Sequence, residues 1–224
     1  MKNFLKIAID LDVAVEVLEN NLKFGISKTR KTDTRPFSFE GMLFGYVFSG
    51  SAKLTHKNES EVKLVQGMYF AVDSDWTLVP TGNVLTISID AYKGLSMFGG
   101  PIEKNGRLSY IDNCTDSLLI PPTKLGDPCL NLLVFPSGVK QTPHTHPSFR
   151  AGIVVSGSGT CELGSQSEPL MPGDFFLIPD NLRHSFFSGS DGLRVIAFHP
   201  DSDYGPTDKV HPMINRTIIE KTNE

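Results

Sequence analysis

The chain has 224 residues and a formal net charge of −4, with 39% hydrophobic and 21% charged residues, so it can bury the core of one large or two smaller globular domains. It contains no long run of lysine or arginine, which argues against nucleic acid as a partner. The apolar stretch near the N-terminus is interrupted by Asp10 and Asp12, so the sequence predicts neither a signal peptide nor a membrane span.

The predicted elements are strands. Residues 10–24 come first and are compatible with a helix, but their valine and isoleucine content and the closing Gly25 favour a strand. Short apolar or alternating runs then recur, separated by turn-forming residues, which is typical of an all-β sandwich or barrel. The runs cover residues 43–48, 63–65, 69–72, 84–89, 130–135, 153–155, 175–178 and 193–198.

The three cysteines are Cys114, Cys129 and Cys161. They are odd in number, have no short spacing and are not preceded by an export signal. This pattern favours reduced thiols in a cytoplasmic protein, with each cysteine serving as a small buried residue.

An internal repeat runs through the chain. The segment FGYVFSGSAKLTH at 44–56 resembles AGIVVSGSGTCEL at 151–163, an offset of 107 residues. The segment LVQGMYFAVDSDW at 64–76 resembles LMPGDFFLIPDNL at 170–182, an offset of 106 residues. Two matching blocks in the same order predict two copies of one β unit of about 110 residues, an ordinary size for a domain.

The boundary between the two copies is predicted in the segment GGPIEKNGRL, residues 99–108. This segment is rich in turn-forming residues and lies between the repeated blocks. We therefore expect an N-terminal barrel over residues 1–104 and a C-terminal barrel over residues 105–224.

A candidate metal site begins with His144 and His146, which lie one residue apart between Pro143 and Pro147. Residues two apart on a strand face the same side, so the two imidazoles project together. The flanking prolines fit an edge or the end of a strand. Aimed into a barrel, the pair forms half of a metal site, which needs a third ligand. The alternative is a pair of exposed surface histidines.

The segment that holds this pair resembles the first motif of the cupin superfamily, G-x5-H-x-H-x3-4-E-x6-G. A later segment, PGDFFLIPDNLRHSF, resembles the second motif, G-x5-P-x-G-x2-H-x3-N. The resemblance covers most of residues 130–200 and extends weakly, through the repeat, to residues 37–90. It implies a bicupin, with two double-stranded β-helix (jelly-roll) barrels in one chain. The matching positions are Gly138, His144, His146, Gly157, Gly173, Pro179 and His184.

Three positions depart from the motifs. Asn181 stands in a glycine slot, where asparagine tolerates a positive φ, and Ser188 stands in the asparagine slot. Arg150 occupies the glutamate slot, and a guanidinium offers no lone pair to a metal. Arg150 then has two interpretations. It points inward and binds an anionic substrate next to the cation, or it turns outward to a surface carboxylate.

The resemblance therefore implies a metal held by His144, His146 and His184, with open positions for water or substrate. We expect a divalent transition metal. Iron(II) is the first choice because open positions beside imidazoles suit oxygen chemistry, and zinc, nickel, manganese or copper are alternatives. Three neutral ligands leave the full charge on the metal, which favours a small anionic molecule as the partner.

The N-terminal copy lacks these ligands. By the repeat offsets, Phe37 and Phe39 replace the histidine pair, Leu43 replaces Arg150, and Leu78 replaces the third histidine. We expect no metal in this barrel. Its interior is expected to be a filled core rather than an apolar pocket, since protein interiors are normally close-packed.

The functional hypothesis that follows is a metal-dependent oxidoreductase, dioxygenase-like, that acts on a small anionic organic molecule. In the cupin family, three-histidine variants occur among oxygenases, which is what the resemblance implies for this chain. A metal-dependent isomerase or cyclase and a non-enzymatic small-molecule binding or sensor protein are the alternatives. A homodimer is expected, because pairing would cover exposed sheet edges.

Overall fold

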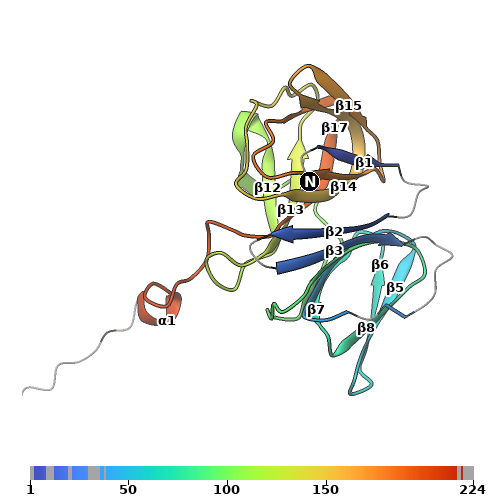
Figure 1. The fold of residues 1–224 in the computed structure, drawn as a ribbon, viewed down its shortest axis with the longest axis vertical. Coiled ribbons are helices and arrows are strands. Elements are labelled where there is room, and N and C mark those ends of the chain that lie inside the picture. Colours follow the sequence, from blue (N-terminus) through green and yellow to red (C-terminus); the bar gives the residue numbers. More distant parts are fainter. Residues whose placement is uncertain are drawn as a thin grey trace, which may run out of the picture.

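The computed structural model describes residues 3–8, 13–19, 22–29, 36–37, 39–215 and 218. Strands dominate the described residues and form two barrels that stack on one another (Figure 1). The predicted all-β fold is therefore confirmed, and the arrangement is consistent with the two predicted barrels. Among the described residues, no helix is long and apolar enough to cross a membrane.

The N-terminal barrel consists of a six-stranded sheet and a three-stranded sheet. The larger sheet has the order β10-β7-β4-β9-β3-β2 and the smaller one the order β6-β5-β8. The described residues of segment 10–24 belong to β2 and β3, an antiparallel pair, so the strand prediction is confirmed for them. The bounds are β2 (Val13–Glu19), β3 (Leu22–Thr29), β4 (Met42–Ser49), β5 (Ser51–His56), β6 (Glu61–Val65), β7 (Tyr69–Asp73), β8 (Trp76–Pro80), β9 (Asn83–Ile89) and β10 (Met97–Gly99).

The C-terminal barrel is one eight-stranded sheet, built around two long antiparallel strands, β14 and β17. Register shifts after Val154 and Gly157 bend this pair. The bounds are β11 (Leu108–Ser109), the 3₁₀ turn η1 (Ile111–Asn113), β12 (Thr115–Ile120), β13 (Cys129–Phe135), β14 (Arg150–Leu163), β15 (Gln166–Leu170), β16 (Phe175–Ile178) and β17 (Ser185–His199), followed by the short helix α1 (Pro212–Asn215).

The first strand, β1 (Leu5–Ile7), joins the C-terminal sheet. It pairs antiparallel with β16, with Leu5 opposite Leu177 and Ile7 opposite Phe175. This strand lies within residues 1–104, the segment that the sequence assigns to the N-terminal barrel. The chain therefore starts on one barrel, crosses to build the other, and returns, which ties the two barrels together.

The repeat seen in the sequence is also a repeat of backbone geometry. Gly50 and Gly157 have φ angles of 75° and 76°, and the next matched pair, Gly67 and Gly173, has 86° and 87°. An added Cβ at Gly157 would lie 2.1 Å from the carbonyl oxygen of Gly192, so only glycine fits this turn. The matched glycines thus mark the same turns in both barrels.

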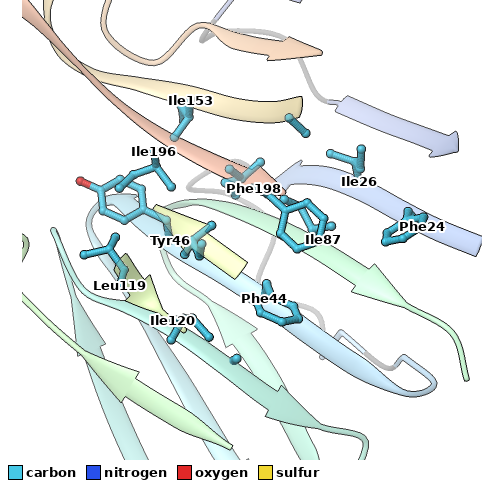
Figure 2. Packing of buried hydrophobic residues seen from close by; sticks show 14 of the residues in the cluster. Phe24, Ile26, Phe44, Tyr46, Ile87, Leu119, Ile120, Ile153, Ile196 and Phe198 are labelled. Atoms are coloured by element: carbon cyan, nitrogen blue, oxygen red, sulfur yellow. The ribbon is translucent and has the colours of Figure 1, made fainter. Parts of the chain in front are cut away.

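The two barrels share a buried apolar layer (Figure 2). Phe24 and Phe44 of the N-terminal barrel pack edge-on against Phe198 of β17, with ring centroids 6.1 Å and 5.3 Å apart. Tyr46 and Ile196 belong to the same cluster (Figure 2). The outward face of β17 is thus fixed by the other barrel, and its inward face is left to line the C-terminal barrel.

The interior of the N-terminal barrel is occupied by apolar side chains. Leu43 and Leu78 are fully buried in one cluster, and Phe37 and Phe39 stack against each other with centroids 6.3 Å apart and pack on that cluster. All four slots that correspond to polar residues of the C-terminal copy are therefore part of a hydrophobic core.

The three cysteines are buried and free of disulfides. Burial raises the pKa of Cys129 and Cys161 to about 12 and that of Cys114 to about 11. At neutral pH all three are therefore protonated thiols and poor nucleophiles.

Candidate metal centre

Backbone pairing brings the predicted ligands together at one end of the C-terminal barrel. His144 and His146 lie in the extended segment between β13 and β14, and His184 immediately precedes β17. His144 and His184 exchange both backbone hydrogen bonds at 2.9 Å, and the N–H of Asn181 donates to the carbonyl of His146 at 2.7 Å. The histidine pair thus lies outside the strands, with His144 in an isolated bridge, and not at the edge or end of a strand as its flanking prolines predict.

The same bridge exists in the N-terminal barrel. There Phe37 pairs with Leu78, as His144 pairs with His184. The repeat offsets of 107 and 106 residues therefore match positions that also correspond in the two folded barrels. The two barrels present the same backbone frame, and only the C-terminal one carries imidazoles on it.

The three imidazoles face one another. Their ring centroids are 4.6 Å apart for His144 and His184, 4.9 Å for His144 and His146, and 5.2 Å for His146 and His184. One ring nitrogen from each lies within 4.8 Å of the other two. Among the described residues, this trio is the group that could hold a metal ion.

Hydrogen bonds set the tautomers of two of these rings. Nδ1 of His144 lies 2.9 Å from the carbonyl oxygen of Thr142, and Nδ1 of His184 lies 2.8 Å from that of Leu182. A carbonyl only accepts, so each Nδ1 carries the proton and each Nε2 keeps its lone pair for a metal. Thr142 is itself held by Asp112, whose carboxylate accepts its N–H at 2.6 Å and its hydroxyl at 3.1 Å.

Burial keeps His146 and His184 neutral. Burial lowers the pKa of His146 to about 3, with further contributions from Arg150 and the other two histidines. Burial likewise lowers the pKa of His184 to about 4, although the hydrogen bond to Leu182 opposes this shift. Neutral imidazoles are the form that binds metals. At neutral pH a metal ion therefore does not compete with protons for the ring nitrogens of these two histidines.

Two of the departures from the motif have a structural reason. Asn181 has a φ of 56°, the left-handed conformation that a glycine slot requires and that asparagine tolerates. The hydroxyl of Ser188 accepts the N–H of Val139 at 2.9 Å and donates to the carbonyl of Pro136. Ser188 therefore fastens the loop that carries the histidine pair to β17.

Arg150, the third departure, is 9% exposed and lines the same pocket as the three histidines. One terminal nitrogen, Nη1, donates to the carbonyls of Phe149 at 2.9 Å and Ser148 at 3.2 Å, and also to the Ser148 hydroxyl. It also lies 3.9 Å from a carboxylate oxygen of Asp201. Arg150 thus lines the pocket, as the inward interpretation predicts, and also lies near a partly exposed carboxylate, as the outward interpretation predicts.

The pocket also holds polar residues that the sequence did not single out. Its cavity of about 40 Å³ has room for about three water-sized groups. Gln141 uses its side-chain oxygen to accept the N–H of Phe186 at 3.1 Å, which orients its amide nitrogen. Polar groups from four further positions line the same walls, namely Tyr110, Asp116, Gln141 and His199.

Asp116 is the carboxylate of this pocket. Its Oδ2 accepts the side-chain N–H of Asn131 at 2.9 Å. Burial raises the pKa of Asp116, while the hydrogen bonds from Asn131 and the Ser117 backbone partly oppose this shift. Nearby Tyr110 also has a raised pKa, again chiefly through burial. Such perturbed groups in a cleft are typical of functional sites.

The raised pKa gives a stability prediction for Asp116→Asn. An acid whose pKa is higher in the folded than in the unfolded state destabilises the fold as pH rises above its ordinary value of 3.8. The amide is nearly isosteric and carries no charge. We therefore expect the variant to melt at a higher temperature than the wild type at pH 7 and at the same temperature near pH 3. Thermal unfolding at both pH values measures this difference; a variant that melts lower at pH 7 contradicts it.

The comparisons with known proteins agree with this geometry. Residues 131–199 match the family model described as the cupin domain. This segment is a cupin domain. The search of curated proteins found no match.

Solved structures of cupin proteins resemble nearly the whole chain. A cupin 2 conserved barrel domain protein from Leptotrichia buccalis has 12% identity and a TM-score of 0.63, covering 86% of this cupin and 90% of that chain. Protein Ylba from E. coli has 16% identity and a TM-score of 0.62, covering 92% and 93%. Oxalate decarboxylase from Bacillus subtilis, a protein with Mn(II) centers, has 11% identity and a TM-score of 0.55, covering 92% and 79%. At these identities the likeness establishes the fold.

The donor set of this cupin fits a divalent transition metal. Imidazole nitrogens are preferred ligands of zinc, copper, iron and nickel, and three of them leave further coordination positions open. The glutamate slot of the motif holds Arg150, whose cation cannot ligate. The site is therefore a three-histidine group with the positive charge of Arg150 beside it.

Proposed function

We propose that this cupin is a metal-dependent enzyme that acts on a small anionic organic molecule, with His144, His146 and His184 holding the metal. The observation that carries the proposal is the convergence of three imidazoles and a buried guanidinium on one small cavity. A surface cluster of histidines would need neither the protonated Nδ1 atoms nor the buried arginine.

The chain's own residues have defined tasks in this proposal. A divalent ion bound there supplies a Lewis acid, and iron(II) also supplies redox chemistry with oxygen. Arg150 binds the anionic group of the substrate, because a guanidinium matches the planar oxygens of a carboxylate. Ser148 and Asp201 hold Arg150 in place. Apolar residues such as Phe176 and Ile178 exclude water from the cavity.

Iron(II) is the ion that we propose for the working enzyme, with dioxygenase-like oxidoreductase activity. Zinc, nickel and copper bind nitrogen ligands more tightly, so purified protein can carry another metal. The neighbouring fold of an oxalate decarboxylase with Mn(II) centers supports manganese as the next metal to test, and a small carboxylate as the substrate class.

The test is turnover by the reconstituted protein. Apoprotein is loaded in turn with iron(II), manganese(II), nickel(II), zinc(II) and copper(II), and is incubated with small carboxylates, thiols and enolisable diketones. Oxygen uptake and substrate loss with iron(II), both absent in His184→Ala, would support the dioxygenase. Substrate loss without oxygen uptake would indicate an isomerase or cyclase. Tight binding of an unchanged ligand would indicate a binding or sensor protein.

We further propose that this cupin works as a homodimer in the cytoplasm. Strand β2 is at the edge of its sheet, and its Leu18 is 77% exposed, so the edge is suited to pair with a second copy. The free buried thiols suit a reducing compartment. Light scattering should give twice the chain mass of 24.6 kDa, and Leu18→Lys should shift the protein to the single-chain mass.

A further inference from the structure

Two buried oxygen atoms near the metal pocket have no hydrogen-bond donor. They are Oδ1 of Asp116 and Oδ1 of Asn131, each enclosed and unpartnered among the described residues. The other atoms of the two side chains bond to each other, with Asn131 Nδ2 donating to Asp116 Oδ2 at 2.9 Å. Buried acceptors are rarely left without a donor in a folded protein, so each such atom needs an explanation.

The position of Asp116 supplies an explanation for its oxygen. Asp116 lines the pocket, on β12, whereas Arg150 lines it from β14, and two other strands lie between these in the sheet. A molecule in the cavity therefore meets an acceptor on one wall and a guanidinium on another. Asn131 lies on the neighbouring strand β13, is 7% exposed, and holds Asp116 from behind.

A purely structural role does not account for the pair. Asn131 offers Asp116 one hydrogen bond, but the pair leaves an acceptor on each side chain unmatched. Apolar residues would fill the same strand positions without that loss, as Leu133 and Ala197 do on the same pocket wall. The arrangement makes sense if the missing donor belongs to a ligand.

We propose that Asp116, positioned by Asn131, is the acceptor subsite for a hydroxyl group of the substrate, which makes the substrate a small 2-hydroxy acid. This inference rests on the proposed function, in which Arg150 and the metal bind the carboxylate. The cavity of about 40 Å³ suits a small molecule whose two groups lie close together, and a 2-hydroxy acid is such a molecule. A neutral hydroxyl donor suits the subsite better than an ammonium group, because the metal and Arg150 already make the pocket positive.

The test compares two probes that differ by one hydroxyl group. Cobalt(II)-loaded protein is titrated with lactate and with propionate at pH 7.5, and binding is followed by the visible absorption of the cobalt. Lactate can also chelate the metal, so the decisive quantity is the ratio of the two affinities in each variant. In Asp116→Asn, the amide oxygen keeps the bond from Asn131 and an N–H₂ group replaces the acceptor. We expect the lactate-to-propionate ratio to fall about tenfold, with propionate binding unchanged.

The outcomes separate this inference from the proposed function. If the ratio is the same in the wild type and in Asp116→Asn, the hydroxyl subsite is wrong while the metal and anion site stands. If neither acid changes the cobalt spectrum of the wild type, the proposed function fails and the inference with it. Asp116→Ala is the second variant, and it should lower the ratio as well. Thermal unfolding of each variant verifies that it is folded.

Discussion

Arg150→Met is expected to weaken the binding of oxalate to the cobalt(II)-loaded protein by about 10- to 100-fold. A hydrogen bond to a charged group contributes about 1.5–3 kcal/mol, and the Arg150 guanidinium is almost fully buried at the pocket wall. Methionine keeps much of the apolar volume but removes the charge. Titration of the cobalt absorption with oxalate measures the change.

Two control variants sharpen this prediction. Arg183 is exposed and lies next to His184 in the sequence, so Arg183→Met removes the same charge near the site without touching the pocket. Its oxalate affinity should equal that of the wild type. Arg150→Lys keeps a charge but loses the planar pair of donors, and it should bind with intermediate affinity. Unchanged binding in Arg150→Met, together with lower thermal stability, would show that Arg150 serves only the fold.

His184→Ala is expected to lower the affinity for cobalt(II) or zinc(II) by more than about 100-fold. Loss of a residue that merely orients a ligand typically lowers metal affinity by about 10- to 100-fold, and loss of a ligand has a larger effect. His184 holds a central place, because its backbone pairs with His144 and its ring faces both other imidazoles. Competition with a chelator of known affinity gives the constants.

His199→Ala is the matched control for this variant. His199 lines the same pocket, and its ring centroid lies 6.3 Å from that of His146, but it is outside the three-histidine group. The variant His199→Ala should bind the metal with wild-type affinity. Equal losses in the two variants would contradict a site made of His144, His146 and His184.

Much of the fold was predictable because glycine turns leave a clear signal in the sequence. Gly50 and Gly157 occupy backbone conformations that other residues avoid, so both copies of the repeat retain them. The repeat offsets match Phe37 and Leu78 to the histidines at equivalent positions. In the structure the backbone of Phe37 pairs with Leu78, just as that of His144 pairs with His184. By contrast, the three-residue strand β1 gives no pattern long enough to predict, and its partner β16 lies far along the chain.

The candidate site was predictable only where a motif marks it. The three histidines and Arg150 hold fixed places relative to glycine turns, and the structure brings all four to one pocket. Asp116, by contrast, lies in the run TDSLLI, and the sequence does not tell which residues of that run face inward. A carboxylate in a strand that ends in three apolar residues was the available signal. Its meaning depends on the register with β13, which places Asp116 opposite Leu133 on the pocket wall.

The most direct test of a three-histidine metal centre is the metal content of the anaerobically purified protein beside that of His184→Ala, both measured by elemental analysis. The structure predicts close to one divalent transition metal ion per wild-type chain and little metal in the variant. A wild-type protein without metal, even after reconstitution with iron(II), manganese(II), nickel(II) and zinc(II), would contradict a metal centre formed by His144, His146 and His184.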